Sequence, residues 1–436
     1  MVQNKLREPL GIFLVLATLF IGISVFLMPI NRVPDEMNHA RMAWNSIFVR
    51  TDTSFDWMNS VSADTEINKS EYKQLFTEKI DLSEEKFQPS FELKRIMHIP
   101  QVLGMILGSI VYPSIGVMVT LGRLFNAVFY IASMYLIITK TRYGKWSMVL
   151  LSLLPIMVQQ AGSLSYDAAN FVAILGFFAF LSLMIENPQI NLKKLFQILL
   201  FALALYITKS NNFLFLLLLF PINFILAGKL SPLEKVNQHI RKLIFKYKYI
   251  LIVLLLVLGG LVGIKMFGGI QGIKELLLVL VRTLFNNNLN GHLNSILTVG
   301  MFGYIGLFSV EIPLWIIFID VALLAFISAL NSDFEIKKIF GFSSLAIIVI
   351  QILAIIAGMY YAWTPLVLGE NAIISVGAQG RYFTPFLIFL VPFFISLKDS
   401  IKVEMSEKLL RFAIILTLVF NFIVSTGLVL DTYWFL

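Results

Sequence analysis

The chain has 436 residues, of which 58% are hydrophobic and only 14% charged, and it contains no cysteine. Soluble chains carry about 25% charged residues, so this composition excludes an ordinary soluble protein, and the lack of cysteine excludes disulfides, thiolate nucleophiles and cysteine metal ligands. The net charge of +8 does not indicate a nucleic-acid partner, because membrane proteins collect Lys and Arg in their cytoplasmic loops. We therefore expect an all-α polytopic membrane protein whose whole length, 1–436, is one integral membrane domain.

Apolar stretches long enough to cross a bilayer recur along the chain. The first, Leu10 to Ile30, is longer than the core of a signal peptide and has no small-residue cleavage site after it, so we expect a retained span. About eleven transmembrane helices are predicted, at 10–30, 114–139, 148–164, 168–185, 194–208, 213–228, 249–267, 312–330, 341–361, 382–397 and 412–430.

The placement of basic residues predicts the orientation of these spans. With a cytoplasmic N-terminus, the cytoplasmic segments hold nineteen Lys and Arg residues, and the short outer loops hold five. The first outer loop, at roughly 67 residues, is too long to count in this comparison. We expect the N-terminus in the cytoplasm and the C-terminus outside.

Two larger extracytoplasmic segments interrupt the predicted spans, 31–113 and 268–311. In the first, "SEYKQLFTEKIDLSEEKF" (70–87) has the mixed charge of a solvated helix. Its last part, Ile99 to Tyr112, is apolar but short and is closed by Pro113, which predicts a juxtamembrane helix, with a spanning helix as the alternative. The second segment contains "NNNLNGHLN" and is expected to form a helix and loop along the surface.

A polar cluster, "NRVPDEMNHARMAW" (31–44), follows the first span. Pro34 disfavours helix before it, and Asp35 is a suitable N-cap for a helix that follows. On that helix Asp35, Glu36 and His39 share one face. Three interpretations stay open: Asp35 only caps the helix and Glu36 favours its positive end, the cluster carries chemistry, or it forms part of a divalent-cation site with an incomplete ligand set.

A second acid lies in "GSLSYDAANF" (162–171), where Asp167 is the one charge between two apolar spans. A carboxylate at the hydrocarbon boundary is costly unless it faces water, a partner or a cavity, although it also could cap the next helix. The predicted topology places Asp167 on the same outer side as Asp35. These two aspartates are therefore candidates for one extracytoplasmic site.

Cations and a further histidine accompany the acids on the outer side. Lys209 lies in the tight turn "ITKSNNF", Arg381 and Tyr382 lie in "GAQGRYFTPF", and His98 lies in "MHIPQ". The plain alternative for each cation is an interfacial side chain that reaches the headgroup layer. The glycines before Arg381 suit close backbone approach to a ligand, and a guanidinium can hold a phosphate in a fork.

Two isolated charges, Arg123 and Asp320, lie inside predicted spans. Such charges either mark a functional path or pair with one another or with the backbone, and we favour the structural interpretation for both. The chain has no Walker sequence, no G-x-G-x-x-G after a strand and no G-x-S-x-G, which argues against nucleotide chemistry. We expect a substrate drawn from the bilayer.

Together these motifs resemble the GT-C class of membrane glycosyltransferases. The "PDEMNHARMAW" and "QGRYFTPF" segments resemble more closely a family of predicted bacterial membrane proteins called domain of unknown function 2142. The resemblance implies a GT-C-like fold with a large first outer loop that carries juxtamembrane helices. It also implies transfer of a sugar, with inversion, from a polyprenyl-phosphate carrier to a glycan acceptor at the outer face of the bacterial plasma membrane.

The resemblance implies a role for each candidate residue. Asp35 would be the general base on the acceptor hydroxyl, with Glu36 beside it, and Asp167 would be the second acid. The stretch "SYDAAN" resembles the acidic motif in the second loop of the oligosaccharyltransferase branch of the class. That branch has a further acid soon after the aspartate, but residues 168–170 supply none, which leaves the metal site of the branch in doubt here. The sequence therefore requires no cofactor and leaves a divalent metal open. The residues expected to bind the phosphate or the sugar are Lys209, Arg381, His39, His98 and Tyr382.

We expect an inverting, polyprenyl-phosphate-dependent glycosyltransferase of the cell envelope. The main alternative is a transporter or flippase for a lipid-linked or anionic substrate, which would need charges along a path through the bundle. Arg123 and Asp320 are few for such a path, and the sequence shows no internal repeat. A third alternative is a non-catalytic scaffold that docks partners on the first outer loop.

Overall fold

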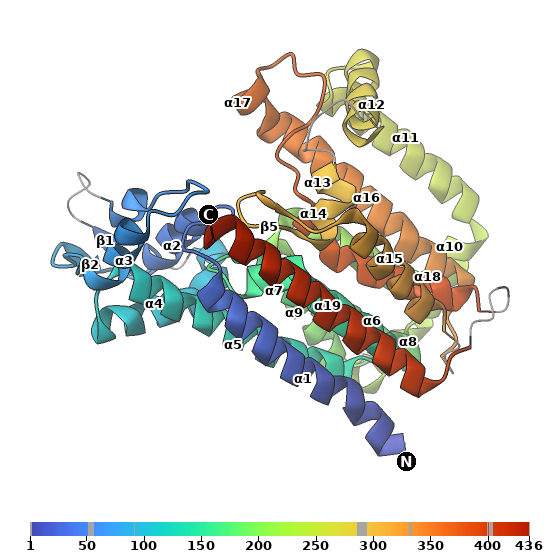
Figure 1. Ribbon diagram of the computed structural model, residues 1–436. Coiled ribbons are helices and arrows are strands. Elements are labelled where there is room, and N and C mark those ends of the chain that lie inside the picture. The colour runs from blue at the N-terminus through green and yellow to red at the C-terminus, as the bar shows by residue number, and fades with distance from the viewer. Residues whose placement is uncertain are drawn as a thin grey trace.

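The computed structural model describes residues 2–50, 56–90, 92–285, 294–330, 334–398, 400 and 404–435. In these residues the chain is mostly helical, and Figure 1 shows a bundle of long helices with a group of short elements at one end. Five of the described helices are long and apolar enough to cross a membrane: α1 (Val2–Leu27), α5 (Ile115–Lys140), α8 (Asp167–Glu186), α16 (Lys338–Ala362) and α19 (Glu407–Tyr433).

Shorter helical segments account for most of the other predicted spans. They are α6 (Lys145–Ser152), α7 (Pro155–Ala161), α9 (Leu192–Thr208), the 3-10 helix η3 (Ser210–Leu219), α11 (Lys248–Met266), α15 (Leu314–Ala329), the 3-10 helix η6 (Thr384–Phe389) and α18 (Leu390–Ser396). Several of them are apolar, as a multi-pass membrane protein requires. The number of spans and their orientation stay predictions.

Three predicted spans are not single continuous α-helices, and one of them, 382–397, consists of η6 followed by α18. The other two are broken at or near a proline. The first, 148–164, is divided between α6 and α7, because Pro155 has no N–H for the preceding turn and begins a new helix. The second, 213–228, is helical only to Leu219. Beyond Pro221 the chain forms β4 (Ile225–Leu226), which pairs in parallel with β3 (Gln189–Ile190).

The segment predicted to be the first outer loop, 31–113, folds into a small unit that packs on α5. Its elements are α2 (Glu36–Trp44), β1 (Phe48–Arg50), η1 (Trp57–Ser60), α3 (Lys69–Thr77), β2 (Glu85–Phe87), η2 (Leu93–His98) and α4 (Ile99–Val111). The helix expected over 70–87 is wrong in its second half: α3 ends at Thr77, and β2 pairs antiparallel with β1. The physical reason is a turn in which the Asp81 carboxylate accepts the Ser83 N–H, followed by a cross-strand contact between Phe48 and Phe87.

The short apolar helix expected at 99–112 is confirmed as α4. Two glycines one turn apart, Gly104 and Gly108, let it lie directly on α5. A Cβ at Gly104 would collide with the backbone oxygen of Leu121, so only glycine permits this approach. Apolar side chains such as Leu103 and Leu107 are exposed on the opposite face of α4, as expected of a helix at the membrane surface.

The segment predicted to be the second outer one, 268–311, begins with α12 (Ile270–Phe285). The expected loop "NNNLNGHLN" falls outside the described residues except for its last residue. The segment continues with α13 (Asn294–Leu297), α14 (Val299–Phe302) and the antiparallel pair β5 (Tyr304–Ile305) and β6 (Val310–Glu311). The remaining elements are η4 (Gly228–Leu233), α10 (Glu234–Lys246), α17 (Thr364–Leu368) and η5 (Gly380–Tyr382).

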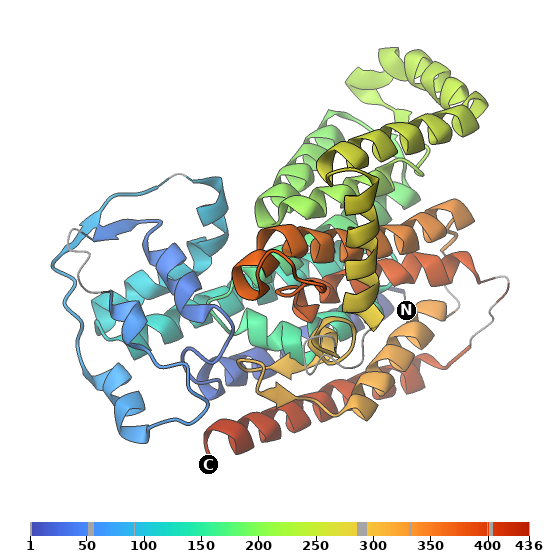
Figure 2. The same ribbon diagram turned by 90° about the horizontal axis from the view of Figure 1, so that it is seen from above.

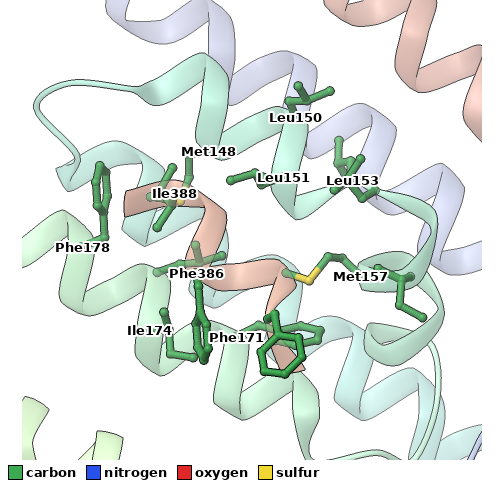
Figure 3. Close-up of a cluster of buried hydrophobic side chains, with 14 of the residues drawn as sticks. Met148, Leu150, Leu151, Leu153, Met157, Phe171, Ile174, Phe178, Phe386 and Ile388 are labelled. Atoms are coloured by element: carbon green, nitrogen blue, oxygen red, sulfur yellow. The ribbon is translucent and has the colours of Figure 1, made fainter. Parts of the chain in front are cut away.

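The core brings together helices that are far apart in sequence. Helices α1 and α19 lie side by side (Figure 1), with the rings of Phe20 and Phe422 stacked 4.1 Å apart. Figure 3 shows η6 wedged between α6 and α7 on one side and α8 on the other, with Phe386 turned toward Phe171 and its neighbours. This packing fixes the segment that directly follows Arg381.

Candidate active site

Asp35 has a left-handed backbone conformation, which is uncommon for residues other than glycine but is tolerated best by Asn and Asp. It has φ 62° and ψ 15° and occupies the N-cap position of α2. Its carboxylate makes no capping hydrogen bond, so a capping bond does not explain this acid. The side chain is 52% exposed, which leaves the carboxylate open to a ligand beside its contact with Arg381.

The neighbouring Glu36 has a different environment. It is fully buried, and both of its carboxylate oxygens bind Arg123 of α5, at 2.8 and 2.6 Å. The same guanidinium donates to the carbonyl oxygens of Val25, Met28 and Pro29 at the end of α1. All five N–H groups of Arg123 are therefore used. The structural interpretation of Arg123 is confirmed, and the ion pair holds α1, α2 and α5 together.

Asp167, the first residue of α8, forms the centre of a buried charge cluster. Its Oδ1 lies 3.0 Å from Nζ of Lys209, and its Oδ2 lies 2.9 Å from Nε of Arg381. Nη2 of the same Arg381 guanidinium lies 3.5 Å from Oδ2 of Asp35. The structure thus joins four separately predicted residues into one neutral cluster, in which Arg381 links the two aspartates.

Local hydrogen bonds place Lys209 beside Asp167. Lys209 occupies the turn between α9 and η3, and three residues later Asn212 donates to Oδ1 of Asn170, at 2.7 Å. Asn170 lies one turn beyond Asp167 on α8, so this amide bond holds the turn against the start of α8. The Lys209 ammonium then lies 3.5 Å from the centre of the Tyr382 ring, a cation–π contact.

Arg381 is fixed by the segments on either side of it. Gly377 has φ 96°, and a Cβ there would collide with the Trp363 ring, so this glycine serves a close approach to Trp363. After Arg381, the Thr384 hydroxyl donates to the carbonyl oxygen of Met301, at 2.7 Å. The guanidinium is held in a fixed direction and is only 3% exposed.

The two predicted histidines form a pair next to this cluster. Nε2 of His98 lies 3.4 Å from Nδ1 of His39, and the Tyr166 ring packs against both imidazoles. Burial lowers the pKa of His39 to about 3 and that of His98 to about 4. Both imidazoles are neutral at ordinary pH, and Nδ1 of His98 has no hydrogen-bond partner among the described residues.

A network of amide and hydroxyl groups supports the turn before Asp167. Gln101 of α4 donates to Asn126 of α5, at 3.0 Å, and Asn126 donates to the carbonyl oxygen of Ser163, at 2.8 Å. The Ser165 hydroxyl accepts the backbone N–H of Asp167, at 3.1 Å. Because Gln101 follows His98 closely in the chain, this network fixes the histidine and the aspartate relative to each other.

A pocket of about 580 Å³ lies beside the cluster, between η2, α9 and α16. At its inner end are Lys209, Tyr166, Tyr382 and His98, and Lys94 adds a second cation. One part of the remaining wall is apolar and consists of Met42, Leu93, Met97, Ile207, Ile355 and Met359, and the other part consists of Tyr206, Thr208, Ser210 and Asn211. Among the described residues that line it there is no carboxylate. This lining fits an amphiphile with an anionic headgroup.

Several of these side chains belong to the exposed apolar surface. Met42, Leu93 and Tyr206 line the pocket and are exposed. Neighbouring exposed apolar residues lie on α9, such as Leu203, and on α4, such as Leu103. The surface around the pocket therefore suits contact with lipid tails.

Other polar residues do not take part in this site. Asp320 of α15 is buried and accepts a hydrogen bond from Asn421 of α19, at 2.7 Å, which confirms a structural pairing for this residue as well. Among the described residues, no group of three or more His, Asp or Glu side chains is arranged to hold a metal ion. The two aspartates of the site share Arg381 instead of standing as a free carboxylate pair.

Sequence reasoning missed two residues of this region, Tyr166 and Lys94. Tyr166 directly precedes Asp167, and its ring lies between the histidine pair and Lys209. Lys94 had no distinguishing signal, since it is one of nine basic residues in the first outer loop. The burial of Glu36 behind the site was missed too, because its partner Arg123 lies on another helix.

Comparison with known proteins gives a family and no activity. Residues 18–390, which include every residue of the site, match a family model described as predicted membrane protein (DUF2142). No curated protein and no solved structure matches the chain.

Proposed function

The chain belongs to the DUF2142 family of predicted membrane proteins, and from this premise and the geometry of the site we propose that it is an inverting glycosyltransferase of the GT-C type. It moves a sugar from a polyprenyl-phosphate carrier to a cell-envelope glycan at the outer face of a bacterial plasma membrane. One observation carries the proposal: Asp35, a half-exposed carboxylate, contacts Arg381, and the next residue, Tyr382, lines a pocket with two lysines, an apolar wall and no carboxylate among its described lining residues.

The pocket is suited to the lipid-linked donor. The isoprenoid chain lies along the apolar wall formed by residues such as Met97 and Ile355, and the phosphate lies at the end that holds Lys209. Lys209 already balances the charge of Asp167, so Lys94 supplies the positive charge that the carrier phosphate still needs. These preorganised cations stabilise the charge that develops on the phosphate as the sugar departs.

Asp35 is suited to activate the acceptor. The acceptor hydroxyl attacks the anomeric carbon from the side opposite the phosphate, and its proton passes to the Asp35 carboxylate. The bond between the anomeric carbon and the phosphate oxygen breaks, and its electron pair stays on the phosphate. A base must lie within hydrogen-bond reach of the proton it removes, and the half-exposed carboxylate of Asp35 is open to such an acceptor.

The buried residues orient this reaction centre. Arg381 bridges Asp35 and Asp167, so we assign it a positioning role in place of direct phosphate binding; it is not among the described residues that line the pocket. His98 lines the pocket, and its buried Nδ1 has no partner among the described residues, so we assign it a sugar hydroxyl of the bound donor. Glu36 stabilises the fold and does not contact the substrate, because Arg123 binds both of its carboxylate oxygens.

The transporter alternative finds less support. A transport path requires charged groups that face a route through the bundle. The two charges inside the predicted spans, Arg123 and Asp320, are each buried in a fixed hydrogen-bonded pair. The cytoplasmic N-terminus and eleven spans remain part of the proposal, because they place the site at the outer face.

The proposal is tested by sugar transfer with purified protein in detergent. With a polyprenyl-phosphate sugar and a glycan acceptor, Asp35→Asn is expected to lower the transfer rate by about 10²-fold or more while the donor still binds. Lys209→Ala is expected to weaken donor binding instead, and Lys229→Ala, in a distant segment, serves as the control. Undiminished transfer by Asp35→Asn, with donor affinity unaffected by Lys209→Ala, would refute the proposal.

A further inference from the structure

Helix α10 (Glu234–Lys246) lies outside the site and connects membrane-type segments. It follows η3 through β4 and η4, and α11 begins only two residues after it. In Figure 2, α10 and α11 project from the main body of the bundle. The helix therefore stays close to the membrane at its C-terminal end, where the apolar α11 starts.

One side of α10 is bound to the protein, which fixes its rotation. Asn237 donates to the carbonyl oxygen of Phe224, at 3.1 Å, and Arg241 donates to that of Ile222, at 3.0 Å. One turn earlier, the Glu234 carboxylate accepts the backbone N–H of Leu226, at 2.6 Å. These three residues lie at helical spacing on one side of α10. These bonds keep the same side of α10 against the protein, so its other sides stay exposed.

The two remaining sides of α10 have opposite character. Val236, Ile240 and Leu243 form an exposed apolar stripe at spacings of four and three residues. The lysines form a second exposed stripe, displaced from the first by about a third of a turn. The lysine stripe consists of Lys235, Lys242 and Lys246.

We propose that α10 lies in the headgroup layer of the membrane and binds anionic lipids. The apolar stripe enters the boundary between headgroups and acyl chains, and the lysines, about a third of a turn away, reach the phosphates. Charge complementarity favours an anionic bilayer as the occupant, since all three exposed charges on that stripe are positive. The covalent link to α11 holds the helix at that surface. This inference does not depend on the proposed enzymatic activity.

The absence of cysteine from the chain makes the test direct. Single cysteines are introduced as Ile240→Cys on the apolar stripe and Lys242→Cys on the lysine stripe, and each is labelled with a polarity-sensitive fluorophore. The full-length protein is placed in nanodiscs of phosphatidylcholine alone or mixed with phosphatidylglycerol. We expect a blue-shifted emission and quenching by lipid-borne quenchers at position 240, and water-like emission at position 242.

The anionic requirement is tested with a charge variant. In the Ile240→Cys background, Lys235→Gln with Lys246→Gln is expected to reduce the ratio of inserted to free helix by roughly fivefold for each lysine removed. The reduction should appear in discs that contain phosphatidylglycerol and be absent in phosphatidylcholine. Equal water exposure at positions 240 and 242 in both kinds of disc would overturn the membrane docking. Insertion that is the same in both kinds of disc would overturn the binding of anionic lipid.

Discussion

Neutralising Glu36 is predicted to lower the stability of the fold, whereas neutralising its neighbour Asp35 is predicted to abolish activity and leave the stability unchanged. Glu36→Gln keeps the shape of the side chain but leaves the Arg123 guanidinium buried without its counter-charge. Removing one partner of a buried ion pair costs about 3–5 kcal/mol. Asp35→Asn changes a half-exposed side chain whose one ion-pair contact, to Arg381, spans 3.5 Å, and Asn readily adopts the left-handed conformation. Its cost should stay within about 0.5 kcal/mol.

The assay is thermal unfolding of the purified protein in detergent, followed by tryptophan fluorescence. Glu36→Gln should melt well below the wild type, and Asp35→Asn should melt with it. Arg142→Met is a matched control, because it removes one partner of an exposed ion pair, Arg142 with Glu186 at 2.8 Å, worth about 0.2–1 kcal/mol.

Sugar transfer completes the comparison. Asp35→Asn should lose the activity although it is fully folded, and Glu36→Gln should lose it only in proportion to the protein that unfolds. A Glu36→Gln protein as stable as the wild type would show that the Arg123 pair does not hold the fold together. A large loss of stability in Asp35→Asn would show that this carboxylate is structural.

Three further outcomes are expected. The pKa of His98 falls from 6.5 in the unfolded chain to about 4 in the folded protein, so the unfolded state binds more protons between these pH values, and the melting temperature should drop as the pH falls from 6.5 to 4. His98→Gln should make this drop smaller. The same pH profile in His98→Gln and in the wild type would contradict this prediction. Lys94→Ala should weaken donor binding about tenfold without lowering the melting temperature, with exposed Lys86→Ala as the control; equal donor affinity in both would exclude Lys94 from the site. Gly104→Ala should destabilise the protein by about 1–3 kcal/mol because α4 must move away from α5. Gly22→Ala is the control, because a Cβ at Gly22 meets open space. Equal melting temperatures of the two variants would refute the close packing of α4 on α5.

Much of the fold follows from the length and polarity of the apolar segments. Those properties are local, so helices such as α5, α8 and α16 occur where the sequence predicts them. The points at which a helix is interrupted are harder to predict from the sequence. Pro155 divides a predicted span into α6 and α7, although a proline near the end of an apolar run also could have left a kinked but continuous helix.

The membership of the charge cluster was also predictable, but its connections were not. Asp167, Lys209 and Arg381 lie at the ends of apolar runs that the sequence predicts to emerge on one side of the membrane, so the sequence predicts a shared site for them. The structure places both cations against Asp167. Which cation binds which acid depends on helix rotation and packing. Sequence spacing reports neither helix rotation nor packing. The sequence therefore predicts that Glu36 lies in the site with Asp35, whereas in the structure its partner is Arg123.

Asp35 illustrates the same limit at the level of one residue. Its position after Pro34 and before α2 was predicted, and an N-cap normally has extended backbone with a capping bond. In the structure Asp35 has a left-handed backbone and makes no capping bond, a combination that sequence spacing does not report.

The central claim is that one pocket holds the carrier phosphate next to the base. The most direct measurement is a cryo-electron microscopy structure of the protein with undecaprenyl phosphate. We predict density for the phosphate against Nζ of Lys209, with the isoprenoid chain along Met97 and Ile355. Phosphate density at any site that does not touch the pocket lined by Lys209 and Lys94 would contradict the claim.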